Sequence, residues 1–144
     1  SDELKYIEDI ILNDFDTFNI DDMNSMFSGF TSLKSLDLSS FNTSNVDDMN
    51  SMFQNCSSLR FLDLSGLDTS NVQDMNCMFN GCSYLRSLDL SGFDTSNVDD
   101  MDSMFDGCDS LKKIIMRGCN KNTIDDISEA LEEADIDAKI ITDW

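Results

Sequence analysis

Histidine is missing from all 144 residues of this sequence, and so is proline. Without histidine the chain cannot form Ser-His-Asp or Cys-His nucleophile pairs, and it lacks the commonest metal ligand. Glycine-rich phosphate-binding motifs of the P-loop and GxGxxG kinds are absent as well. Catalysis would therefore depend on carboxylates alone, as in glycoside hydrolysis, and an active site should interrupt a repeat rather than follow it. We expect no enzyme activity and no cofactor.

Basic residues are scarce. The chain carries 9 Lys and Arg against 29 Asp and Glu, which gives a formal net charge of −20 at pH 7. This charge repels nucleic acids and anionic membrane surfaces. No apolar run approaches the roughly 20 residues that a membrane-spanning helix needs. We therefore expect neither a nucleic-acid partner nor membrane insertion.

A repeat dominates what the sequence does contain. Four large apolar residues stand 26 residues apart (64 − 38, 90 − 64, 116 − 90): Leu38, Leu64, Leu90 and Met116. The segments Val46–Asn71 and Val72–Asn97 are identical at 19 of 26 positions. Self-similarity at a fixed period in this range is typical of stacked repeat architectures. A chain of this length can bury a continuous core, so we expect one monomeric domain.

Each repeat is predicted to contain a short strand, a turn and a helix. Leu36 and Leu38 are two residues apart and face one side of a strand, whereas Asp37 faces the other. Asn45 ends a turn cluster and is a suitable helix N-cap. Apolar residues then recur at steps of three and four, as on one face of a helix: Val46, Met49, Phe53 and Cys56.

Such units bury their apolar faces only by stacking. Parallel strands joined through helices are normally right-handed. Strands stack about 4.8 Å apart whereas packed helices need about 8–10 Å, so the stack should bend. We predict an α/β fold: a right-handed leucine-rich-repeat solenoid with a short parallel sheet on the concave side and about five helices on the convex side. An N-terminal cap (1–9), repeats (10–118) and a C-terminal helix and strand cap (119–144) would form the domain, with Thr123 as N-cap of the last helix.

The segment Leu88–Leu111, LDLSGFDTSNVDDMDSMFDGCDSL, resembles the repeats of the BspA-type leucine-rich repeat surface proteins. The resemblance extends over about residues 10–118. It implies a bacterial cell-surface or secreted protein involved in adhesion, since related repeats occur on bacterial surfaces and in mycoplasma lipoproteins. It implies no catalytic residue and no metal site. The alternative location is the cytoplasm, because no signal segment is seen in the sequence.

The five cysteines do not form a disulfide framework, because their number is odd and their spacing wide. Cys56, Cys82 and Cys108 share the repeat position at which the first unit has Phe30, which indicates small core hydrophobes. Helices about 8–10 Å apart would hold adjacent cysteines beyond the roughly 4.4–6.8 Å that a disulfide spans between Cα atoms. We predict that all five are reduced.

Two sets of polar residues repeat with the frame. Acidic pairs stand where helices are predicted to begin, and we interpret them as favourable to the helix dipole: Asp21-Asp22, Asp47-Asp48, Asp99-Asp100 and Asp125-Asp126. A calcium array is the alternative, although no calcium-loop motif is present. A threonine column is interpreted as turn hydrogen bonding rather than as an ice-binding surface: Thr17, Thr43, Thr69 and Thr95.

A candidate binding face follows from residues that break the repeat. Phe61 stands where neighbouring units have serine or lysine, and Tyr84 stands where they have serine. Two charged columns flank these aromatic residues: Asp37, Asp63 and Asp89, and Lys34, Arg60, Arg86 and Lys112. The columns could pair with each other and keep the sheet soluble, or form a mixed-charge ligand face. On the second interpretation Arg60 and Arg86 would bind a carboxylate or sulfate.

We therefore predict a ligand-binding site on the concave face, made of Phe61, Asp37, Asp63, Asp89, Arg60, Arg86 and Tyr84. The alternative is that Phe61 merely covers the sheet beside Leu62. The predicted function is a non-catalytic binding or adhesion module that recognises a protein or carbohydrate partner. The alternative is a structural spacer that presents another domain. A spacer should repeat at every position, so the variable exposed aromatic residues favour a binding module.

Overall fold

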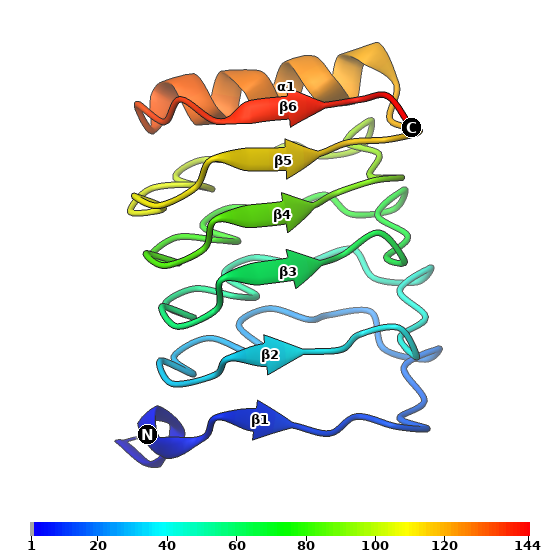
Figure 1. Cartoon of the computed structure of the whole chain (residues 1–144). Coiled ribbons are helices and arrows are strands. Elements are labelled where there is room, and N and C mark those ends of the chain that lie inside the picture. Colours follow the sequence, from blue (N-terminus) through cyan, green and yellow to red (C-terminus); the bar gives the residue numbers. More distant parts are fainter. Residues whose placement is uncertain (1) are drawn as a thin grey trace.

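The computed structural model describes residues 2–144, and it is a mixed α/β structure with short parallel strands and one α-helix (Figure 1). The described chain begins with a 3-10 helix, η1 (Asp2–Tyr6), and the α-helix lies near its end, α1 (Lys121–Glu133). The six strands are β1 (Asp9–Ile10), β2 (Ser35–Leu36), β3 (Phe61–Asp63), β4 (Ser87–Asp89), β5 (Lys113–Ile115) and β6 (Lys139–Ile141).

The strands stack in chain order as successive parallel rungs, with β1 and β6 at opposite ends of the stack (Figure 1). Strands β1 and β2 form one sheet, and β3 to β6 form a second, four-stranded sheet. Paired residues are 26 apart (87 − 61, 113 − 87, 139 − 113), so the sequence period is the distance along the chain from one rung to the next. The α/β class, the parallel strands and the predicted last strand are thus confirmed.

The core lies behind the strands. The middle residue of each central strand points inward and is buried, as the alternation predicted: Leu62, Leu88 and Ile114. A ladder of phenylalanine rings runs through the core from rung to rung: Phe27, Phe53, Phe79 and Phe105. Neighbouring ring centroids are 5.7, 5.8 and 5.6 Å apart and the planes differ by at most 14°.

The repeated helices predicted on the other side of the core are absent from residues 2–144, and this prediction is wrong. The layer opposite the sheet, which we call the turn layer, consists of runs of tight turns. In one run, Met52 N–H donates to the carbonyl of Met49 (3.3 Å), while Met49 N–H itself donates to Asp74 of the next rung (2.9 Å). Alternate amides therefore bond between rungs and are unavailable for helical bonds. Left-handed backbone at Ser51 (φ 57°) and Asn55 (φ 64°) also interrupts any helix.

The sheet was predicted to be concave because packed helices would bend the stack, and this argument no longer holds without those helices. It required packed helices about 8–10 Å apart on one side of the stack. Instead, backbone hydrogen bonds join the rungs on both sides, for example Leu64 N–H to Asp89 O in the sheet and Phe53 N–H to Met78 O in the turn layer (2.9 and 3.0 Å). Rung spacing is therefore similar on the two sides.

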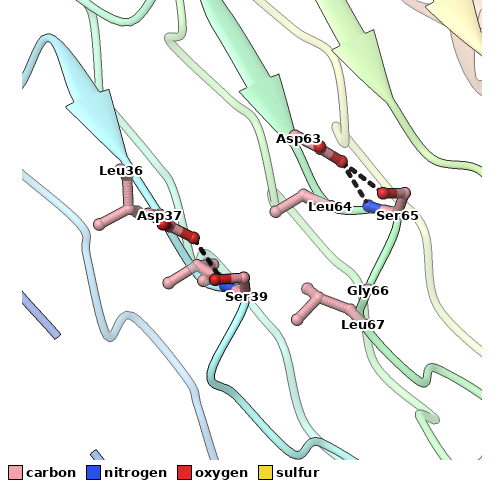
Figure 2. Close-up of a pocket in the computed structure, with 9 residues that line it drawn as sticks. Leu36, Asp37, Ser39, Asp63, Leu64, Ser65, Gly66 and Leu67 are labelled. Carbon is pink, nitrogen blue, oxygen red and sulfur yellow. Dashed lines mark hydrogen bonds between the residues drawn. The ribbon is translucent and has the colours of Figure 1, made fainter. Parts of the chain in front are cut away.

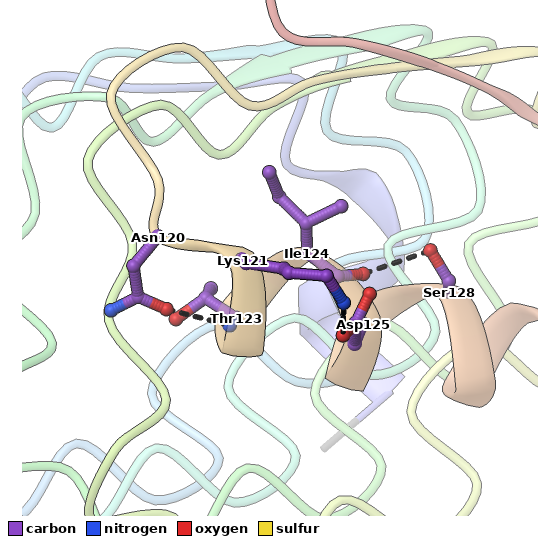
Figure 3. A network of polar contacts seen from close by, with 6 residues as sticks. All are labelled: Asn120, Lys121, Thr123, Ile124, Asp125 and Ser128. Carbon is purple, nitrogen blue, oxygen red and sulfur yellow. Dashed lines mark hydrogen bonds and ion pairs between the residues drawn. The ribbon is translucent and has the colours of Figure 1, made fainter.

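The two ends of the described chain differ from the repeats. Helix α1 confirms the predicted C-terminal helix, but its N-cap is Asn120 rather than Thr123 (Figure 3). The Asn120 side chain accepts a bond of 2.8 Å from the amide of Thr123. On the exposed surface of the helix Lys121 pairs with Asp125 at 2.6 Å. A single turn of 3-10 helix, η1, stands at the predicted N-terminal cap.

Candidate functional site

The outward face of the sheet carries most of the predicted site. Phe61 on β3 is 51% exposed, and Ser87 on β4 pairs beside it. Asp63 and Asp89, at the other ends of these strands, are also paired neighbours. Tyr84 precedes β4 and is 59% exposed. The structure therefore brings the aromatic residues to the surface but keeps the aspartates at the opposite ends of the strands from the arginines.

The aspartates of this face hold turns. Asp37 accepts from the amide of Ser39 (2.9 Å), and Asp63 accepts from both the amide and the hydroxyl of Ser65 (2.9 and 2.6 Å; Figure 2). Asp89 accepts in the same way from the amide of the serine two residues on. Hydrogen bonding to Ser39 lowers the pKa of Asp37. These carboxylates thus hold the turns that follow the strands.

The basic residues gather at the amino ends of the strands. Six of the nine in the chain lie there, and we call them the basic edge: Lys34, Arg60, Arg86, Lys112, Lys113 and Lys139. Arg86 N–H donates to the carbonyl of Arg60 (2.8 Å), and Lys112 N–H donates to that of Arg86 (3.0 Å). Lys113 and Lys139 are paired on β5 and β6. The basic edge therefore places cations on five successive rungs.

Charge pairing between the two columns, one of the two interpretations of the sequence, does not occur. Within residues 2–144 the ion pairs are Lys34 with Glu8 (3.5 Å, both exposed) and the Lys121–Asp125 pair on α1. Surface pairs of this kind contribute little to stability. Arg60 and Arg86 have no carboxylate partner in this part of the chain, because the neighbouring aspartates serve their own turns.

The sheet has a gap between β2 and β3. These strands are not paired, and no backbone hydrogen bond joins Lys34 to Arg60 in residues 2–144, although Arg60 and Arg86 are joined one rung further on. The turns after these two strands also differ from the later turns. Gly92 and Gly118 have left-handed backbone there (φ 80° and 73°), whereas Ser40 and Gly66, at the same repeat position, do not. A Cβ atom opposes that conformation at Ser40, but Gly66 carries none, so the serine alone does not account for the gap.

Two cavities open along this gap. One, of about 410 Å³, is lined by Asp37 and Asp63 and by apolar residues that include Leu36 and Leu64 (Figure 2). The other, of about 360 Å³, is lined by Lys34, Ser58, Arg60 and Tyr84. The gap thus brings two predicted site residues, Arg60 and Tyr84, together with Lys34 around one opening.

The five cysteines are thiols in the structure. Cys56 and Cys108 are fully buried, and burial raises the pKa of each to about 12. The thiol of Cys56 donates to the carbonyl of Phe27 (3.1 Å), and that of Cys82 to Phe53 (3.2 Å). The argument from helix spacing was wrong, because bonded rungs about 4.8 Å apart lie within disulfide reach. The three thiols of the buried column, Cys56, Cys82 and Cys108, each donate a hydrogen bond to a carbonyl of the preceding rung.

The other repeated polar residues are structural. Thr43 donates to the carbonyl of Asp68 and accepts from its amide (2.9 and 2.8 Å), so the threonine column forms hydrogen bonds between adjacent rungs rather than within its own turns as predicted. The acidic pairs do not begin helices in the repeats, and Asp48 instead accepts from the amide of Asn50 (2.8 Å). Among the described residues, no three Cys, Asp or Glu side chains are placed to hold a metal ion.

The sequence matches the family described as "Mycoplasma protein of unknown function, DUF285" over two overlapping stretches, residues 2–61 and 21–144. The chain belongs to this family. No curated protein and no solved structure matches it. Neither helix in residues 2–144 of this DUF285 chain has the length and apolar character needed to cross a bilayer.

Sequence reasoning missed two features of the site. Lys113 and Lys139 were not included among the site residues, although their 26-residue separation places them on adjacent rungs. The gap beside β2 was also missed, and the sequence does not mark it clearly, because Ser40 and Gly66, on its two sides, both lack left-handed backbone although their side chains differ. The remaining predicted residues lie on the face or edge to which the alternation assigned them.

Proposed function

We propose that this DUF285 chain is a non-catalytic binding module, a monomeric right-handed leucine-rich-repeat solenoid of the BspA-like kind. It would belong to a bacterial cell-surface or secreted protein and recognise a protein or carbohydrate partner. The family description, which refers to mycoplasma proteins, and the stacked rungs support this proposal.

The observation that carries the proposal is the exposure of side chains that depart from the repeat. Phe61 and Tyr84 leave more than half of their surface exposed, although neighbouring rungs have small polar residues at both positions. Exposed aromatic residues bordered by arginine are typical of recognition centres. Nothing in the packing of the core requires them, because the buried frame repeats without them.

The alternative is a spacer whose surface has no partner. The regular turn layer, in which aspartates and asparagines serve turns rung after rung, favours that reading for its side of the stack. The two hypotheses therefore differ in whether the outward sheet face and its edges bind a partner.

The test compares two variants that make the chain more regular. The double variant Phe61→Ser with Tyr84→Ser restores residues of neighbouring units on the sheet side. Gln73→Asp restores the repeat residue in the turn layer, since Asp47 and Asp99 stand at the same position, and is the matched control. Both would be screened with the parent on a glycan array and on a panel of immobilised extracellular proteins. We expect the parent and Gln73→Asp to bind the same partner and the double variant to lose it. Equal binding by all three would contradict the proposed site, and no binding by any would favour the spacer.

A further inference from the structure

Apart from Lys34, which pairs with Glu8, the cations of the basic edge have no ion-pair partner among residues 2–144, although the chain is strongly acidic. The chain contains 29 acidic residues, yet Arg60, Arg86 and Lys112 pair with none of those described. Backbone bonds hold these three residues on adjacent rungs, about 4.8 Å apart. Like charges at this separation repel one another. The edge therefore has an electrostatic reason to take anions from outside the chain.

An aromatic residue and a cavity lie beside these cations. The opening of about 360 Å³ between Lys34 and Arg60 is lined by Ser58 and by Tyr84, which is 59% exposed. It lies where the ladder is interrupted between β2 and β3. A flat ring beside cations suits a ligand that has both a ring face and acidic groups.

The arrangement of the cations narrows the chemistry of that ligand. At least one basic residue on each of five rungs suits a linear polymer with an acidic group on each unit, laid along the stack. A guanidinium group binds a flat pair of oxygens with two parallel hydrogen bonds, as carboxylate and sulfate offer. Sugar rings present an apolar face to an aromatic side chain, which an acidic peptide of glutamates does not.

We propose that the basic edge binds a sulfated polysaccharide, with the sugar chain running from rung to rung, sulfates at Arg60 and Arg86, and one sugar ring on Tyr84. This inference rests on the proposed function, since it names the partner of the same face. The net charge of −20 repels the polymer at long range, so binding depends on these contacts and weakens as salt is added.

Calorimetry with the whole chain tests the proposal. The probes are a heparin-derived octasaccharide, the same octasaccharide after desulfation, and a glutamate octapeptide. We expect binding of the sulfated probe, weakened by added sodium chloride, and at least tenfold weaker binding of the other two. Equal binding of the glutamate peptide would show that the edge responds to charge alone and would overturn the proposal. Equal binding of the desulfated probe would also overturn it.

Variants locate the site. Arg60→Gln and Arg86→Gln should each weaken binding about tenfold, the effect expected when a hydrogen bond to a charged group is lost. Tyr84→Ser should weaken it, whereas Tyr84→Phe keeps the ring and should retain binding. Lys121→Gln removes a cation from α1, away from the edge, and should change nothing. A loss with Lys121→Gln as large as with Arg60→Gln would exclude the edge as the site.

The outcome also separates this inference from the proposed function. A chain that ignores all three probes but binds another partner through Phe61 would disprove the sulfated ligand and keep the binding module. Melting temperatures of the variants check that the fold is intact, because Arg60, Arg86 and Tyr84 are exposed and their removal leaves the core unchanged.

Discussion

The phenylalanine ladder gives the sharpest test of the core. Phe79 is fully buried and stacks between the rings of Phe53 (5.8 Å, 2°) and Phe105 (5.6 Å, 14°). Replacing it with alanine should lower the free energy of unfolding by about 3–5 kcal/mol, through lost transfer energy and the cavity left behind. Phe105 stacks on only one ring of the ladder. The free energy of unfolding should therefore fall less for Phe105→Ala than for Phe79→Ala, and the difference should be roughly the 0.5–1.5 kcal/mol that one ring pair contributes.

Double-mutant cycles with leucine test the rung order. Phe53 and Phe79 are neighbours, so their Phe→Leu changes should be coupled by roughly 0.5–1.5 kcal/mol. Phe53 and Phe105 lie two rungs apart and should be additive within about 0.5 kcal/mol. The free energies of unfolding are measured by urea unfolding followed by far-ultraviolet circular dichroism. Phe61→Ser, at an exposed position, is the control and should change the free energy of unfolding by less than about 0.5 kcal/mol. A loss below about 1 kcal/mol for Phe79→Ala, or equal coupling in the two cycles, would refute the ladder.

Three other predictions follow from the thiols, the gap and the helix cap. Because the pKa values of Cys56 and Cys108 are raised to about 12, almost no thiolate is present at these residues at pH 8. Both should therefore react with a thiol reagent only at the rate at which the chain unfolds. Rapid labelling of the folded chain would contradict their burial. Ser40→Gly removes the Cβ atom from the turn after β2, but the gap should persist and hydrogen exchange at the amide of Arg60 should be unchanged, because Gly66 on the other side of the gap is not left-handed although it lacks a Cβ atom. Slower exchange at Arg60 would show that Ser40 causes the gap. Asn120→Ala should destabilise the chain by about 0.5–2 kcal/mol in urea unfolding, whereas an unaltered midpoint would show that the cap bond to the helix is dispensable.

The sheet side of the fold could be predicted from the sequence, because apolar and polar residues that alternate along a short segment indicate a strand with one buried face. A strand must direct every second side chain inward, so the buried Leu62 fixed the orientation of Phe61 and Asp63. The 26-residue period then fixed which residues are neighbours. The predicted places of Arg60 and Tyr84 followed from the same register.

The turn layer could not be predicted in the same way, because apolar residues at steps of three and four fit either a helix or a run of turns. The choice depends on where the amides bond. In the stack, Met49 and Ser51 donate to the next rung, and such bonds do not exist in an isolated unit. The sequence around Ser51 likewise gives no sign that its backbone is left-handed, since residues other than glycine rarely adopt that conformation. Whether Asp63 pairs with arginine was left open for a related reason, because the sequence does not show that its carboxylate is used by the local turn at Ser65.

The stacking of rungs end to end has a mechanical consequence. Strands β1 and β6 lie at opposite ends of the stack (Figure 1), so a pull between them loads the joints between rungs in series. Each rung that peels away releases 26 residues (87 − 61), or about 90 Å of extended chain. The weakest joint on the sheet side is the one between β2 and β3, where strand pairing is missing. Under tension the chain would lengthen stepwise from that joint, and so dissipate force instead of transmitting it as a rigid rod.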